Sequence, residues 1–194
     1  MNLPNKLTLL RVFLIPFFLL FMYWNIPFHY LIALVIFAAA SITDALDGKI
    51  ARKHNLVTNF GKFLDPLADK VLVISALTVF VEIPEINMGA VPLIIISARE
   101  FMVSGLRLLA ADSGIVVAAG IWGKLKTAFT MVSIVVALIW LSVYHDFDFI
   151  ISNGVKNAVD NIIIPALIWI STALTIISGG VYLKGYWHLI DSDK

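Results

Sequence analysis

The sequence predicts an all-α integral membrane protein with six transmembrane helices and both termini on the cytoplasmic side. Its composition is 60% hydrophobic and 14% charged, and the mean hydropathy is +0.95, well outside the range of soluble globular domains. Apolar runs of about 20 residues, the length that crosses the hydrocarbon core of a bilayer, recur along the whole chain. Basic residues gather in one set of the connections between these runs.

The apolar runs are separated by short polar or proline-containing breaks. We predict one membrane-embedded domain over residues 1–194, because the spans leave no room for a separate soluble domain. An apolar run follows Lys6 and Arg11 as in a secretory signal, but no small-x-small cleavage site follows it, so we interpret it as an uncleaved first span. The predicted spans are residues 7–24, 29–52, 63–82, 90–110, 121–144 and 160–183.

The orientation follows from the basic residues near the span ends, which favour the cytoplasmic side. One set of connections holds Lys6, Arg11, Lys49, Arg52, Lys53, Lys62, Arg107, Lys124, Lys126, Lys184 and Lys194. Lys156 is the single basic residue in the opposite set, where the acidic residues are Glu82, Glu85, Asp146, Asp148 and Asp160. Tyr182 and other aromatic residues near the span ends are typical of interfacial belts, and Ser178-Gly179-Gly180 is typical of a close helix contact.

Four aspartates lie in one short stretch of this apolar chain, at spacings of three, eighteen and four residues: Asp44, Asp47, Asp65 and Asp69. Acidic residues in or beside membrane spans are costly, so a functional role is the default interpretation. Asp44 and Asp47 share one helix face, and Asp65 and Asp69 lie one turn apart on the next segment. Two such faces can converge on one or two hard cations, which prefer oxygen ligands.

Other kinds of site have little support. The chain has no cysteine, which excludes disulfides and zinc–thiolate centres, and the four histidines show no metal-ligand spacing. The net charge is only +1, so a nucleic-acid partner has no electrostatic basis.

The aspartates belong to a longer pattern, D-x2-D-G-x2-A-R-x8-G-x3-D-x3-D, whose eight fixed positions run from Asp44 to Asp69. This pattern resembles the signature of the CDP-alcohol phosphotransferases at every fixed position. The family transfers a substituted phosphoryl group from a CDP-linked donor to an alcohol and releases CMP. The resemblance implies Asp44, Asp47 and Asp65 as metal ligands. Asp69 either completes a two-metal site or acts as general base on the acceptor hydroxyl, and the cofactor is Mg²⁺ or Mn²⁺, with two ions expected.

The small residues of the pattern suit a nucleotide, which can lie against a helix only where side chains are absent. Gly48 and Ala51 would clear such a surface, Gly61 would do so from the facing segment, and Arg52 would contact a phosphate. Together with Asp44, these residues form the predicted CDP-binding set. Close helix packing is the alternative interpretation of Gly48 and Ala51.

Pro66 leaves two arrangements open, because the residue before a proline avoids the α region. In one, Asp65 caps the third span and Pro66 takes its first helical position. In the other, the span begins earlier and is bent at the proline.

The acceptor substrate is predicted from basic residues near the cytoplasmic ends of the spans. Arg107, Lys124 and Lys126 meet at the cytoplasmic ends of the fourth and fifth spans, where no acidic partner is expected, and would hold a second phosphate. That favours a phosphorylated acceptor such as glycerol 3-phosphate. The alternative for Lys124 and Lys126 is an ordinary positive-inside role. Arg99 and Glu100, deep in the fourth span, are either a structural ion pair or a substrate contact.

Over nearly its whole length the chain resembles the bacterial phosphatidylglycerophosphate synthases of this family. The resemblance rests on residues 2–11, on Arg99-Glu100 and 104–107, and on 123–127. It implies CDP-diacylglycerol as donor, glycerol 3-phosphate as acceptor, a homodimer, and the bacterial cytoplasmic membrane with the site facing the cytosol. The open alternatives are the same fold with phosphatidylglycerol, inositol phosphate or serine as acceptor, and a small cation transporter.

Overall fold

The computed structural model is helical throughout the residues it describes, which are 3–53, 59–112, 114–115, 120–146 and 152–187. Side chains are described for residues 5–43, 64, 67–111, 114–115, 120–146 and 152–187. The long helices are α1 (Leu3–Tyr23), α2 (His29–Lys53), α3 (Asn59–Glu82), α4 (Ala90–Asp112), α5 (Ile121–Asp146) and α7 (Ile164–Tyr186). A 3₁₀ turn η1 (Pro84–Ile86) precedes α4, and α6 (Asn153–Ala158) and a π-helical turn η3 (Val159–Ile163) lead into α7. The predicted all-helical class is confirmed.

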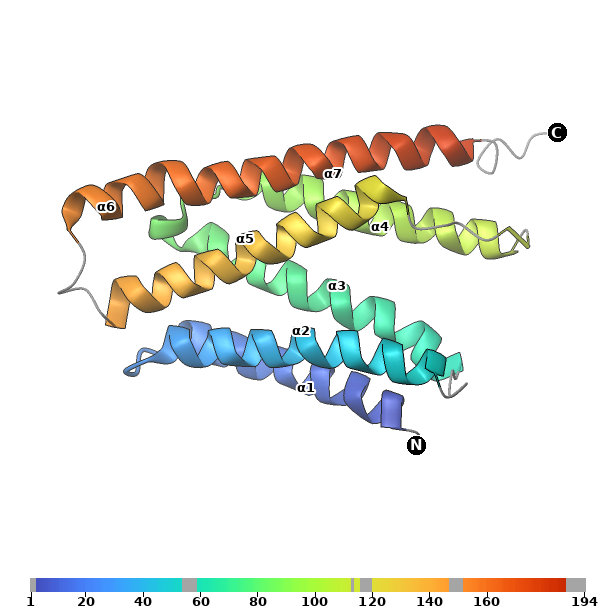
Figure 1. Ribbon diagram of the computed structural model, residues 1–194, viewed down its shortest axis with the longest axis horizontal. Coiled ribbons are helices and arrows are strands. Elements are labelled where there is room, and N and C mark those ends of the chain that lie inside the picture. Colours follow the sequence, from blue (N-terminus) through green and yellow to red (C-terminus); the bar gives the residue numbers. More distant parts are fainter. Residues whose placement is uncertain (1–2, 54–58, 113, 116–119, 147–151, 188–194) are drawn as a thin grey trace.

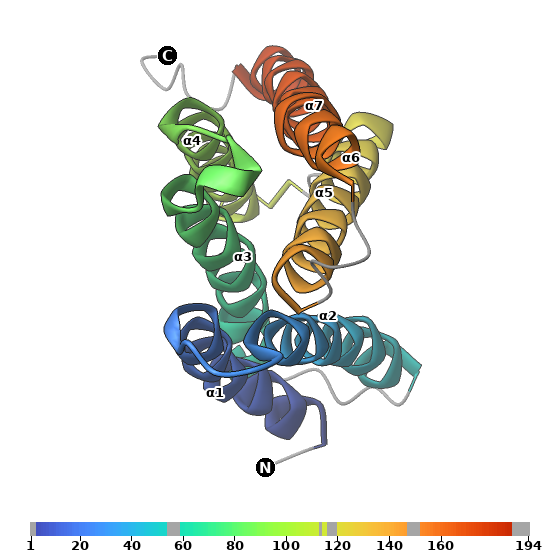
Figure 2. The same cartoon turned by 90° about the vertical axis from the view of Figure 1, so that its left-hand side faces the viewer.

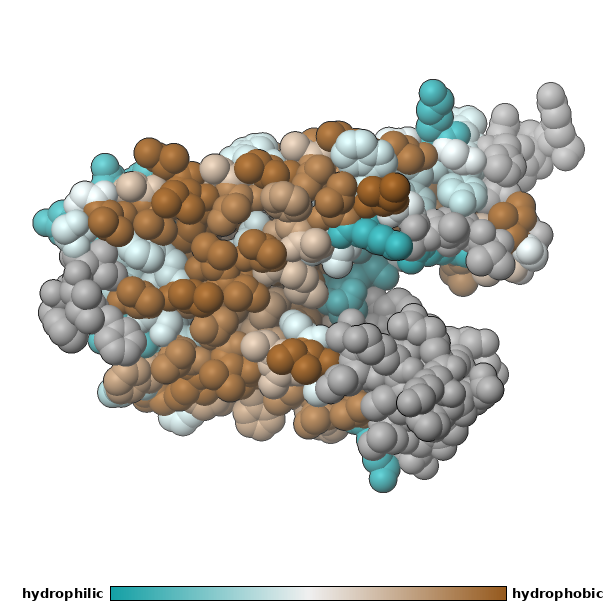
Figure 3. Space-filling model, in the orientation of Figure 1, coloured by the Kyte–Doolittle hydropathy of each residue, from teal (hydrophilic) through white to brown (hydrophobic). Residues whose placement is uncertain are grey.

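Three of these helical stretches are long and apolar enough to cross a membrane: Asn5–Tyr23, Ile121–Asp146 and Asn153–Tyr186. A shorter apolar stretch occupies His29–Thr43 in α2. α3 and α4 match predicted spans, but they carry ionisable residues in their sequences. A band of hydrophobic residues covers the middle of the molecule in Figure 3. The chain is a multi-pass membrane protein, and the number of six spans stays a prediction.

The helices are arranged in pairs, with α1 beside α2 in an antiparallel hairpin (Figure 1). Phe18 and Phe37 are both fully buried in that hairpin, with ring centroids 5.8 Å apart. Seen along the molecule, α3 and α4 lie on one side and α5 and α7 on the other (Figure 2). The N-terminus, the end of α2, the start of α3 and the end of α7 lie at the same end of the molecule (Figure 1).

α7 approaches α5 and α4 through small residues. Thr130 and Ser171 are hydrogen-bonded with a distance of 2.6 Å between their hydroxyl oxygens, and Ser133 donates to the Leu167 carbonyl at 3.2 Å. A Cβ at Gly179 would lie 3.3 Å from Cγ of Arg99 and 3.4 Å from Cε of Met102. In a membrane the hydrophobic effect does not drive helices together, so they associate by close packing, and small residues allow the backbones to approach. The predicted close contact is therefore confirmed for Gly179, whereas a Cβ at Gly180 would meet no atom within 4 Å among the described residues.

The opposite end of the molecule is held by hydrogen bonds between connections. The Tyr23 hydroxyl donates to Glu82 at 2.8 Å, and the backbone N–H of Phe28, at a φ of 61°, donates to Asp146 at 3.0 Å. The Trp140 indole donates to Asp160 at 2.6 Å. The predicted fifth span ended at residue 144 and the sixth began at residue 160, but α5 continues to Asp146 and helix resumes at Asn153.

The two arrangements left open by Pro66 are now distinguished. α3 begins at Asn59, so Pro66 lies inside the helix and not at its first position. The helix that the sequence placed over 63–82 starts earlier, as the second alternative required. Asp65 and Asp69 therefore lie one turn apart on the same helix.

The two neighbouring glycines of α7 give a matched test of the α4–α7 contact. We expect Gly179→Leu to force α4 and α7 apart and to lower the free energy of unfolding by about 1–3 kcal/mol, the usual cost of overpacking. Gly180→Leu projects into open space and should leave stability nearly unchanged. The unfolding temperature of both variants in the same detergent checks this. Equal loss in the two variants would contradict the close contact.

Candidate functional site

The residues of the aspartate pattern lie on two consecutive helices at one end of the molecule. Asp44, Asp47, Gly48, Ala51 and Arg52 belong to the last three turns of α2, while Gly61, Asp65 and Asp69 belong to the first three turns of α3. These two helix ends lie together in Figure 1, and α2 contacts α3. Asp69 is the one residue of the pattern whose side chain falls among those the structure describes. The other seven lie outside the residues whose side chains are described, so their predicted roles stay predictions.

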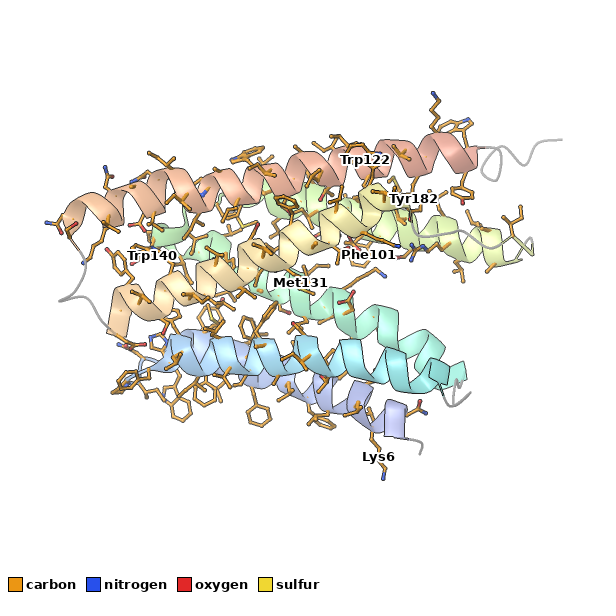
Figure 4. The ribbon with its side chains drawn as sticks, viewed as in Figure 1. Lys6, Phe101, Trp122, Met131, Trp140 and Tyr182 are labelled. Atoms are coloured by element: carbon orange, nitrogen blue, oxygen red, sulfur yellow. The ribbon has the colours of Figure 1, made fainter. Side chains whose placement is uncertain are left out.

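Asp69 lines a small cavity between α3, α4 and α5 with a volume of about 30 Å³. A cavity of this size has room for one or two water molecules. Met131, on α5, forms part of its wall and is marked in Figure 4 in the middle of the molecule. The lining residues are Asp69, Lys70, Val73, Glu100, Lys126, Thr127, Thr130 and Met131.

Four of the eight described residues that line the cavity are charged. Glu100 Oε1 accepts from Lys126 Nζ and also from Arg99 Nη1, the latter at 3.2 Å. Lys126 is 4% exposed, and a buried ammonium is stable only beside a compensating anion. The expectation that the basic residues here lack an acidic partner is wrong for Lys126, because helix packing brings Glu100 of α4 against it. Arg99 and Glu100 do form an ion pair, and this contact leaves a substrate contact by Glu100 untested.

A second cluster of polar contacts surrounds Tyr182 of α7 and shares Arg99 with the first. The Tyr182 hydroxyl accepts from Arg107 Nη2 at 3.3 Å and from the backbone N–H of Gly120 at 3.2 Å. The guanidinium carbon of Arg99 lies 5.3 Å from the Tyr182 ring centroid, and Arg99 Nη2 donates to Ser178 at 2.6 Å. Tyr182 therefore joins α4, α7 and the start of α5. Figure 4 shows it between these helices.

The three basic residues predicted to hold a phosphate occupy different depths. Arg107 and Lys124 are exposed, whereas Lys126 is buried beside Glu100. Gly123 lies next to Lys124, and a Cβ there would come within 3.4 Å of the Tyr182 hydroxyl. Arg107 and the first turn of α5 thus meet at Tyr182, while Lys126 belongs to the cavity of Asp69. Figure 3 shows hydrophilic residues beside a hollow at this end of the molecule.

Sequence reasoning missed two members of the site. Lys70 lines the cavity and interacts electrostatically with Asp69 and Glu100. Its position directly after the last aspartate was the available signal. Tyr182 was interpreted as an interfacial aromatic residue, but it is 5% exposed. Its spacing of four residues from Ser178 places both on the face of α7 that meets Arg99.

No group of three or more histidine, cysteine or acidic side chains able to hold a metal ion occurs among the described side chains. Three of the four predicted ligands, Asp44, Asp47 and Asp65, fall outside that set. The predicted metal site is therefore neither supported nor opposed by this observation.

Comparison with known proteins gives one consistent result. A family model described as CDP-alcohol phosphatidyltransferase matches residues 1–177. A relative from Bacillus subtilis (strain 168), named CDP-diacylglycerol--glycerol-3-phosphate 3-phosphatidyltransferase, is 39% identical over 100% of this chain and 99% of its own length. Relatives with the same name from Rickettsia bellii and Escherichia coli K12 are 37% and 43% identical, over 94% and 72% of this chain and 94% and 76% of their own lengths. The chain therefore belongs to the CDP-alcohol phosphatidyltransferase family.

Proposed function

We propose that this protein transfers the phosphatidyl group of CDP-diacylglycerol to glycerol 3-phosphate, producing phosphatidylglycerol phosphate and CMP. The observation that carries the proposal is the full-length similarity to relatives named for this reaction. All eight fixed positions of the aspartate pattern are also present. The basic residues beside the Asp69 cavity add support for a phosphorylated acceptor.

The donor set fits a hard divalent cation. Four carboxylates lie on two helices that meet at one end of the molecule, and magnesium and manganese both prefer oxygen ligands. We propose that Asp44, Asp47, Asp65 and Asp69 hold the metal, with two ions of Mg²⁺ or Mn²⁺. Bound metal would neutralise charge on the pyrophosphate of the donor and stabilise the leaving CMP.

The chain's own residues bind the donor and handle the proton. Gly48, Ala51 and Gly61 leave room for the cytidine nucleotide against the helices, and Arg52 contacts a phosphate. Asp69 takes the proton of the acceptor hydroxyl at a carboxylate oxygen. The acceptor oxygen then bonds to the phosphatidyl phosphorus while the bond from that phosphorus to the CMP oxygen breaks.

The acceptor phosphate is assigned to Arg107, Lys124 and Lys126. Arg107 and Lys124 are exposed, on the side that we propose faces the cytosol, and Tyr182 holds Arg107 beside the first turn of α5. Lys126 contributes from inside, where Glu100 already balances its charge. The exposed pair is therefore expected to supply most of the phosphate binding.

The location of the protein follows from the same charges. Basic residues gather at the end that carries the aspartate helices, which supports a cytosol-facing site in a bacterial cytoplasmic membrane. The homodimer remains a proposal from the family resemblance. Membership of a transferase family leaves the cation-transporter alternative without support.

Metal removal tests the aspartate site. Thorough chelation should abolish CMP release by the purified protein, and added Mg²⁺ or Mn²⁺ should restore it. Asp44→Asn, Asp47→Asn and Asp65→Asn should each lower kcat/KM at least about a hundredfold, because an amide cannot balance the cation and metal stabilisation amounts to several kcal/mol. Asp160→Asn, at the opposite end, is the control. A wild-type rate after chelation would refute the metal site.

The acceptor site is tested by removing its exposed charges. Arg107→Ala and Lys124→Ala should each lower kcat/KM for glycerol 3-phosphate about tenfold to a hundredfold, the effect of losing a charge-assisted contact of about 1.5–3 kcal/mol. The KM for CDP-diacylglycerol should stay nearly unchanged. Lys184→Ala removes an exposed charge from the last turn of α7 and serves as the control. An equal loss of donor binding would instead assign Arg107 and Lys124 to the donor phosphates.

A further inference from the structure

Glu100 is the acidic residue of the cavity for which neither the aspartate pattern nor the acceptor-phosphate set provides a role. It lies on α4, one helix away from the aspartates, and its side chain is 15% exposed. Its backbone carbonyl accepts from Ser104 at 2.7 Å, and Arg99 and Lys126 fix its carboxylate. The carboxylate is therefore held in one orientation at the wall of the cavity.

The two oxygens of this carboxylate differ. Oε1 accepts from both Arg99 and Lys126, whereas Oε2 has no hydrogen bond to any side chain or backbone group among the described residues. An ionised carboxylate has about four acceptor positions. Glu100 therefore keeps acceptor capacity for a ligand that donates a hydrogen bond.

The size of the cavity restricts what that ligand group is. About 30 Å³ has room for one or two hydroxyl groups, each similar in size to water, but not for a phosphate with its several oxygens. Carboxylate oxygens also repel a phosphate and accept from a hydroxyl. The chemistry and the volume at Glu100 both select a hydroxyl.

The other carboxylate of the cavity is Asp69, on the facing helix. Two carboxylates that line one small cavity match the two adjacent hydroxyl groups of a 1,2-diol. On the proposed function, on which this inference rests, Asp69 serves the reacting hydroxyl of glycerol 3-phosphate. The neighbouring secondary hydroxyl then lies on the side of Glu100, and the phosphate extends toward Arg107 and Lys124.

We propose that Glu100 determines acceptor specificity by accepting a hydrogen bond from the secondary hydroxyl of glycerol 3-phosphate. A site built to pair with a substrate hydroxyl rejects the analogue that lacks it, because its polar group is then left without a partner. Glu100 thereby distinguishes a phosphorylated 1,2-diol from other phosphorylated alcohols. The contacts with Lys126 and Arg99 hold it in position for this role.

The test compares two acceptors that differ only in this hydroxyl. 3-Hydroxypropyl phosphate keeps the phosphate and the reacting primary hydroxyl of glycerol 3-phosphate but lacks the secondary one. CMP release is measured with CDP-diacylglycerol and each acceptor in turn. The wild-type protein should favour glycerol 3-phosphate in kcat/KM by about tenfold to a hundredfold.

Glu100→Gln keeps the shape of the side chain and removes its charge. We expect the preference for glycerol 3-phosphate to fall at least about fivefold in this variant, mainly through the loss of activity with glycerol 3-phosphate. Glu82→Gln makes the same change at the last residue of α3, far along the helix from Asp69, and should keep the wild-type preference. If Glu100→Gln does not fold, Glu100→Asp is measured in the same way, and a reduced preference is again expected.

Two results would overturn the proposal. One is a wild-type protein that uses both acceptors equally well, a result that needs no variant. The other is an equal loss with both acceptors in the Glu100 variant, which would mean that Glu100 supports the helices without contacting the hydroxyl. The proposed function would fail separately, through the absence of CMP release from wild-type protein with glycerol 3-phosphate and Mg²⁺.

Discussion

The ion pair between Glu100 and Lys126 is the interaction on which the rest of this site depends. Lys126 is 4% exposed in a largely apolar bundle, where a lone ammonium would be costly to bury. Glu100 balances that charge and also holds Arg99, which in turn contacts Ser178 and the Tyr182 ring. One carboxylate thus links α4 to α5 directly and to α7 through a single arginine. Glu100 and Lys126 line the cavity together with Asp69 of α3.

The two ends of the molecule are built for different purposes. At the end away from the aspartates, connections are tied by neutral donors to single carboxylates, as in Tyr23 to Glu82 and Trp140 to Asp160. These contacts fix the helix ends. At the aspartate end, acidic and basic side chains from three helices share one cavity. Transfer between two phosphorylated substrates needs both signs of charge at close range, and this end of the molecule supplies them.

The fold was predictable because its signals are local. The lengths of the apolar runs located the six long helices to within a few residues. α1 and α3 each begin four residues earlier than predicted, at Leu3 and Asn59, and helix precedes the predicted start of the last span at 160, because α6 and η3 lead into α7. Pro66 left the start of α3 open in the sequence, because a helix that starts earlier can contain a proline when neighbouring helices support it. The spacing of the aspartates likewise predicts a functional stretch, which the structure places on α2 and α3, and its role stays a prediction.

The acceptor side was less predictable because it depends on packing between distant segments. Glu100 and Lys126 are 26 residues apart, and Arg107 and Tyr182 are 75 apart. No periodicity within one helix reveals such pairs. The sequence therefore correctly predicted that these basic residues lie at one end of the bundle. It could not show that the charge of Lys126 is balanced by Glu100. The same limit explains why Tyr182 was read as an interfacial residue.

We propose that this end of the molecule strongly prefers glycerol 3-phosphate to other alcohols as the acceptor. The most direct measurement is CMP release by the purified protein with CDP-diacylglycerol, Mg²⁺ and a panel of acceptors. The panel contains glycerol 3-phosphate, glycerol, serine, inositol phosphate and phosphatidylglycerol. Release of CMP with glycerol 3-phosphate alone, together with formation of phosphatidylglycerol phosphate, is the predicted result. Faster release with any other member of the panel would contradict the claim.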